Sequence, residues 1–153
     1  MTLKYKKATI ADLEILTETR IEVLRAANEL SDDIDMSDVK KQTFEYYKKA
    51  LEDKTHSAYL VFDGEKIVGT GAVSYFQVMP TFHNPTGKKA YIMNMYTKPA
   101  YRRRGIAFKV LDLLVTEAKA KGITAISLEA TAKGKSLYTK YGFVKMNDEM
   151  ELP

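Results

Sequence analysis

One segment, residues 91–107, constrains the fold of this chain more than any other. Residues 91–97 form an apolar, β-prone run, and Pro99 ends it because proline cannot donate a hydrogen bond to a sheet ladder. A basic turn containing Gly105 follows and runs directly into an amphipathic helix. The turn and the start of the helix direct unpaired N–H groups and the positive end of the helix dipole to one place. The sequence therefore predicts an anion site there.

The spacing within the turn indicates which anion is bound. Arg-x-x-Gly-x-Ala, at Arg102, Gly105 and Ala107, favours a pyrophosphate over a lone carboxylate. Gly105 lets the backbone approach the ligand closely, and Ala107 keeps the first helical turn slim. Basic clusters are usually solvated faces or weak nucleic-acid patches. The cluster here comprises Lys98, Arg102, Arg103 and Arg104. The glycine spacing and the helix start make a phosphate site the better interpretation.

With these residues the chain resembles the GCN5-related N-acetyltransferase (GNAT) family, which moves an acetyl group from acetyl-coenzyme A (acetyl-CoA) to an amine. In that family, a Gln/Arg-x-x-Gly-x-Gly/Ala motif after the fourth strand holds the coenzyme A pyrophosphate. A second stretch, residues 136–143 (Ser-Leu-Tyr-Thr-Lys-Tyr-Gly-Phe), is similar to the family's Leu-Tyr-x-x-x-Gly-Phe signature. The resemblance covers essentially the whole chain and is strongest from Ala90 to Phe143.

The expected order of elements agrees with this resemblance. The sequence predicts strands at Leu3–Ala8, Ala58–Phe62, Lys66–Tyr75, Tyr91–Thr97 and Ile123–Ala130, with one or two closing strands over Phe143–Leu152. It predicts helices from Thr9 to about Asn28, from Ser37 or Asp38 through Leu51, from about Arg104 to Gly122, and over Gly134–Tyr141. The resemblance implies an α/β (α+β) fold in a single N-acetyltransferase domain over residues 1–153. Its mixed central sheet has helices on both faces, and its fourth and fifth strands run parallel and splay apart.

In that family, backbone groups in the gap between the splayed strands pair with the pantetheine arm of the cofactor like an added strand. The resemblance therefore implies a set of acetyl-CoA contacts. They are Met95, Tyr96, Thr97, Arg102, Arg103, Arg104, Gly105, Ile106, Ala107 and Thr131. Met95 and Thr97 would offer main-chain N–H and C=O groups. Thr131 lies seven residues before Tyr138, where the family often has asparagine, and a threonine hydroxyl can still donate.

Acetyl transfer sets three chemical requirements: an unprotonated amine, stabilisation of the oxyanion, and a proton donor for the departing thiolate. Tyr138 stands where the family carries that acid, and a pKa of about 10 keeps a phenol protonated. The alternative is a half-buried tyrosine with a satisfied hydroxyl. No general base is assigned. Asn94 could hold a relaying water, and His83 is either a base on a nearby loop or a solvated loop histidine. The role of Glu129 depends on the face it takes.

Composition agrees with a small enzyme. The chain has 153 residues, of which 45% are apolar and 29% charged, which is typical of one globular domain. It has no cysteine, which excludes disulfides and thiolate metal sites, and we expect no metal. The N-terminus lacks the apolar core of a signal peptide, so we expect a cytoplasmic protein that does not enter membranes. The net charge of +4 suits an anionic cofactor but is too mild to indicate nucleic-acid binding, and a homodimer is left open.

The sequence does not determine the acceptor, which could be a polyamine, an antibiotic amine, an amino acid, or a lysine or N-terminus of a protein. We expect its contacts on the first two helices and in the Tyr75–Lys88 region. The acidic run Asp32, Asp33, Asp35 and Asp38 either attracts a cationic amine or is a solvated loop. The apolar set Tyr75, Phe76, Met79 and Phe82 either lines an acceptor pocket or packs in the core. Because no base is assigned, a catalytically silent acyl-CoA-binding module is the alternative function; a nucleic-acid-binding domain lacks a recognition motif.

Overall fold

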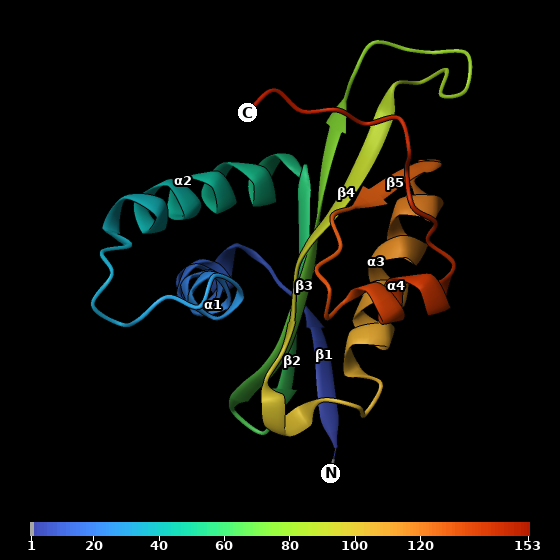
Figure 1. Cartoon of the computed structure of the whole chain (residues 1–153). Coiled ribbons are helices and arrows are strands. Elements are labelled where there is room, and N and C mark those ends of the chain that lie inside the picture. Colours follow the sequence, from blue (N-terminus) through green and yellow to red (C-terminus); the bar gives the residue numbers. More distant parts are fainter. Residues whose placement is uncertain (1) are drawn as a thin grey trace.

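The computed structural model describes residues 2–153, and its centre is a five-stranded mixed sheet whose spatial order follows the chain order (Figure 1). The strands are β1 (Leu3–Lys7), β2 (His56–Asp63), β3 (Lys66–Gln77), β4 (Lys88–Thr97) and β5 (Ala125–Leu128). The first four strands pair antiparallel, and β5 pairs parallel to β4. The chain returns to β5 through a helix, as a parallel connection requires.

Helices cover both faces of the sheet, as the sequence predicts (Figure 1). One face carries α1 (Leu13–Ala27) and α2 (Ser37–Asp53), and the other carries α3 (Ile106–Ala120) and α4 (Lys135–Tyr141). Two short 3-10 turns, η1 (Ile10–Asp12) and η2 (Pro99–Tyr101), precede α1 and α3. The first turn is closed by a capping box in which the Thr9 N–H donates to the Asp12 carboxylate over 2.8 Å. In residues 2–153, no helix combines the length and apolar character needed to cross a membrane.

Each face of the sheet has its own core, because successive strand residues point to opposite faces. Leu60 packs with Leu16 and Tyr47 under α1 and α2. Its neighbour Val61 belongs to the core under α3, where Leu114 is fully buried. The sheet is therefore packed between two helical layers, and β4 lies between β3 and the edge strand β5.

The fourth and fifth strands separate partway along β4, as predicted. Their pairing ends at Ile92 and Leu128, whereas β4 continues to Thr97. Residues 93–97 thus have no strand partner on the β5 side. On the other side, the register shifts so that Asn94 and Met95 together oppose Gly71, which is a β-bulge. Asn94 adopts the left-handed conformation there (φ 58°), which asparagine tolerates better than most residues.

Gly71 makes room for the bulge. A Cβ atom at this position would lie 2.5 Å from the Met95 Sδ and 2.6 Å from the Val110 Cγ1. We expect Gly71→Ala to lower the free energy of unfolding by ~1–3 kcal/mol, the usual cost of overpacking a core. Urea unfolding followed by circular dichroism measures it. Gly69→Ala is the matched control on the same strand, because its Cβ would meet no atom closer than 3.0 Å. Equal stability of the two variants would contradict the clash.

The C-terminal segment differs from the prediction. No strand is formed over Phe143–Leu152, and β5 is the last strand of the described chain. Its apolar residues Val144, Met150 and Leu152 are at least 86% exposed. The segment has β-prone residues, but a strand exists only when a neighbour pairs with it, and local sequence does not supply that partner. The prediction of closing strands is therefore wrong. The predicted strand at Ile123–Ala130 is also shorter, at Ala125–Leu128.

Candidate functional site

The basic turn presents a group of unpaired backbone donors at the start of α3. Arg103 and Gly105 both have positive φ, 62° and 79°, which turns the chain sharply into the helix. Within residues 2–153, no hydrogen bond is donated by the N–H groups of Arg103, Gly105, Ile106, Ala107 and Phe108. The positive end of the helix dipole adds to these five donors. This arrangement can hold an anion such as a pyrophosphate.

The arginines of the turn differ in how they are held. The Arg102 Nε donates to the Thr97 carbonyl over 3.0 Å, and its guanidinium lies 6.0 Å from the centre of the Tyr96 ring. The Arg104 guanidinium lies 5.2 Å from the ring centre of Tyr101. The turn is thereby tied to the end of β4. One lone pair of the Thr97 carbonyl is already used, and the other remains for the predicted cofactor contact.

A cavity of about 300 Å³ opens where β4 and β5 separate. It is lined by Arg20, Tyr91, Ile92, Met93, Asn94, Glu129, Ala130 and Thr131. Of the residues predicted to contact the cofactor, only Thr131 lies in this wall. The Met95 side chain instead packs into the core under α3, so only its backbone can face the gap.

Tyr138 lies beside this cavity without lining it. A Cβ on Gly134 would be 2.9 Å from the Tyr138 ring and 3.5 Å from the Thr131 hydroxyl, so both side chains flank that glycine. The ring also packs edge-on against Phe143, at 6.2 Å between centres. Its hydroxyl has no hydrogen-bond partner within residues 2–153. Burial raises the pKa of the Tyr138 phenol, which keeps it protonated and able to donate.

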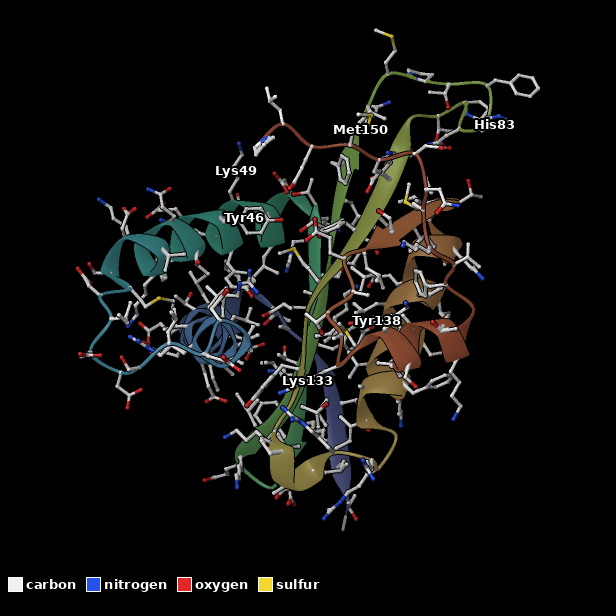
Figure 2. All side chains as sticks on the ribbon, viewed as in Figure 1. Tyr46, Lys49, His83, Lys133, Tyr138 and Met150 are labelled. Carbon is white, nitrogen blue, oxygen red and sulfur yellow. The ribbon has the colours of Figure 1, made fainter. Side chains whose placement is uncertain are left out.

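A second cavity, of about 550 Å³, lies between the sheet and the helices α1 and α2. It is lined by Arg20, Gln42, Thr43, Tyr46, Tyr47, His56, Ser74, Phe76, Tyr91, Met93 and Asn94. Four of these residues, Arg20, Tyr91, Met93 and Asn94, also line the smaller cavity. The two cavities therefore meet at one side of β4. Figure 2 shows Tyr46 on α2 on this side of the sheet.

Arg20 joins α1 to the bulge of β4. Its Nη1 donates to the Asn94 side-chain oxygen over 2.9 Å, and burial lowers the pKa of its guanidinium. No carboxylate within residues 2–153 forms an ion pair with Arg20. Sequence reasoning missed this residue. The signal was present, because Arg20 follows Leu13 and Leu16 at helical spacing and thus lies on the otherwise apolar face of α1.

His56 is the second residue that the sequence did not indicate. It is only 5% exposed, and its Nδ1 lies 3.2 Å from the Tyr46 hydroxyl and 3.1 Å from the Ser74 hydroxyl. Burial, and then the charge of Arg20, lower the pKa of His56 to about 4. The imidazole is therefore neutral at pH 7, and its Nε2 is buried without a hydrogen-bond partner in the described chain.

The structure shows where the other candidate site residues lie. His83 lies on the loop between β3 and β4, far from Tyr138, and packs against Phe82 (Figure 2). None of the acidic residues of the 32–38 run lines either cavity; Asp35, for example, accepts from the N–H of Ser37 at the start of α2.

The apolar residues that we expected to line an acceptor pocket lie in different places. Phe76 lines the larger cavity, whereas Met79 and Phe82 are exposed at 85% and 91%. The Tyr75 hydroxyl donates to the Glu117 carboxylate of α3, on the other face of the sheet.

Comparison with known proteins agrees with this geometry. The chain belongs to the acetyltransferase (GNAT) family, whose sequence profile matches residues 23–143. A predicted acetyltransferase from Clostridium acetobutylicum, solved with acetyl-CoA, is 34% identical with a TM-score of 0.90, and the match covers 99% of this chain and 96% of that one. A GCN5-related N-acetyltransferase from Ralstonia eutropha JMP134 shares the fold, at 24% identity, a TM-score of 0.85 and coverage of 99% and 98%. No curated protein matches the chain.

Proposed function

We propose that this protein is an enzyme that transfers an acetyl group from acetyl-CoA to a primary amine by direct attack in a ternary complex. The observation that carries this proposal is the junction of the two cavities at Arg20, Tyr91, Met93 and Asn94. One substrate can enter from the splayed strands and the other from the side of α1 and α2. Both then reach the same stretch of β4, which direct transfer requires.

The cofactor would follow the surface from the basic turn to this junction. Its pyrophosphate would bind the N–H groups of Arg103, Gly105, Ile106 and Ala107, with the charges of Arg102, Arg103 and Arg104 around it. Its pantetheine arm would pair with backbone groups of residues 95–97, which β5 leaves uncovered. Thr131 would bound the gap on the β5 side. The similar Clostridium protein, solved with acetyl-CoA, supports this choice of cofactor.

The site also carries groups suited to the proton transfers. The amine must lose a proton before it attacks the thioester. Glu129 is the only carboxylate among the described residues that line these two cavities, and it is the group we assign to accept that proton, directly or through water. Tyr138 would donate to the departing thiolate. Sequence alone left the role of Glu129 open, because it depended on which face the residue takes.

Turnover with a panel of primary amines tests the proposal. Acetyl-CoA consumption that depends on an amine and yields the acetylated amine supports the enzyme. The alternative, a silent acyl-CoA-binding module, predicts tight binding of coenzyme A with no amine-dependent turnover.

Ligand-dependent stability gives a further expected result. Coenzyme A at about 100 times its Kd should stabilise the folded protein by about 2.7 kcal/mol, because it binds only the folded state. ATP and NAD should raise the melting temperature much less, since they have no pantetheine arm to pair with residues 95–97. Differential scanning fluorimetry at matched concentrations measures the three shifts. Equal stabilisation by ATP would indicate a generic phosphate site at the turn.

A further inference from the structure

The charges in the larger cavity constrain the amine that it accepts. Arg20 is the only charged side chain among its lining residues, because His56 is neutral at pH 7. Among residues 2–153, no aspartate or glutamate lines this cavity. A polyamine or an aminoglycoside carries several positive charges, and carboxylates are the side chains that bind such charges most strongly. This wall offers such a ligand one repulsive cation instead.

Within the described part of the chain, Arg20 has no counterion of the kind that a partly buried charge normally has. Its one hydrogen-bond partner in the described chain is the neutral amide of Asn94. A guanidinium has five N–H donors in a planar fork, which matches the two oxygens of a carboxylate. Removing a charge from water is costly unless the charge is paired. An anionic group of the substrate would therefore supply the counterion of Arg20.

The rest of the cavity wall is largely aromatic. Tyr46, Tyr47, Phe76 and Tyr91 surround it, together with Met93. The Tyr46 and His56 rings stand edge to face, at 5.3 Å between centres. Such a wall binds an apolar or aromatic side chain, and polar contacts are provided by Gln42, Thr43, Ser74 and Asn94.

We propose that the acceptor is an α-amino acid with an apolar or aromatic side chain, whose carboxylate pairs with Arg20 and whose α-amino group is acetylated. The inference rests on the proposed acetyl transfer. Arg20 lines both cavities, so a carboxylate bound to it lies at the junction where the nitrogen must attack. Carboxylate and amine must therefore be close neighbours in one molecule, as they are in an α-amino acid. The single positive charge of Arg20 matches the single negative charge of a carboxylate. A phosphate group carries a larger negative charge and matches it less well.

Matched acceptors test this inference. L-phenylalanine should have a kcat/KM at least ~10-fold above that of L-phenylalaninamide or 2-phenylethylamine, the order of one charge-assisted bidentate contact. The amide is a stringent comparison, because its amine is less basic and a larger share of it is already neutral. Spermidine and glucosamine 6-phosphate should be poorer still. Equal rates for the acid and its amide, or a preference for spermidine or for the phosphate, would overturn the inference.

Substitutions in α1 test whether Arg20 causes the preference for the acid over the amide. Arg20→Gln should reduce the preference for acid over amide towards 1, and Arg20→Lys should restore part of it. Arg25→Gln is the control on the same helix: it removes the same charge, lines neither cavity, and should leave the preference unchanged. An acid-over-amide preference that survives Arg20→Gln undiminished would remove Arg20 from carboxylate recognition.

Binding separates this inference from the proposed activity. Calorimetric titration of coenzyme A-saturated protein should show phenylalanine binding at least ~10-fold more tightly than its amide. Such selective binding without turnover would keep the inference and reject the activity. Acetylation of spermidine with no binding of phenylalanine would keep the activity and reject the inference. Neither binding nor turnover of any acceptor would reject both.

Discussion

Tyr138→Phe should lower turnover ~10- to 1000-fold with little change in acetyl-CoA affinity, the pattern of an interaction made mainly in the transition state. The phenylalanine keeps the ring, which packs against Phe143 and beside Gly134, so the local structure should persist. Only the hydroxyl is lost. Because burial raises the pKa of that hydroxyl, it stays protonated over the neutral range and can donate to the departing sulfur. Steady-state rates at saturating acetyl-CoA measure the effect.

Tyr141→Phe is the matched control on the same short helix. Its hydroxyl donates to Asp112 of α3 over 2.7 Å, so its loss removes one exposed hydrogen bond worth ~1 kcal/mol of stability. Turnover should be unaffected. If Tyr138→Phe also turns over at the wild-type rate, Tyr138 has only a packing role, and the proton must reach sulfur from water or from the amine.

Gly105→Val should weaken acetyl-CoA binding by at least about 2 kcal/mol, or ~30-fold in Kd. A Cβ at Gly105 would meet no protein atom within 4 Å, so the valine side chain would enter the space over the free N–H groups rather than the core. The ligand, not the fold, would be displaced. Isothermal titration with acetyl-CoA measures the loss, and circular dichroism checks that the variant is folded.

Backbone strain must be separated from this steric effect, because Gly105 has a φ of 79° that valine adopts only at a cost. Gly122→Val is the control. Gly122 follows the other end of α3, has a φ of 76°, and is equally open around its Cα. It should lose similar stability and keep its affinity for acetyl-CoA. Equal affinity losses in the two variants would show that strain transmitted through the helix, rather than blocked phosphate contacts, weakens binding.

Local sequence was a good guide to the geometry of the basic turn. The run 91–97, the stop at Pro99 and the glycine-containing turn are contiguous, so their chemistry can be read in order. The structure places the turn at the start of α3, where the N–H groups of Gly105, Ile106 and Ala107 donate no hydrogen bond within residues 2–153. It also shows the separation of β4 from β5, which the family resemblance implied and periodicity did not. The bulge at Asn94 had no sequence signal, because it depends on the register against β3.

The C-terminal residues show the opposite case, a local strand pattern that forms no strand. Their alternation resembles a strand, yet no element pairs with them, and hydrogen bonding between strands is not a local property.

What the sequence determined by itself was the family and the segments that carry its two motifs, because those signals lie in consecutive residues. What only the tertiary structure decided was the acceptor side. Arg20, Tyr46, His56 and Asn94 come from four different elements, and each has an ordinary role when seen alone. They form one wall because α1 and α2 pack on the face of the sheet where β4 bulges. The charge of that wall, on which our proposal for the acceptor rests, is a consequence of packing between segments distant in sequence.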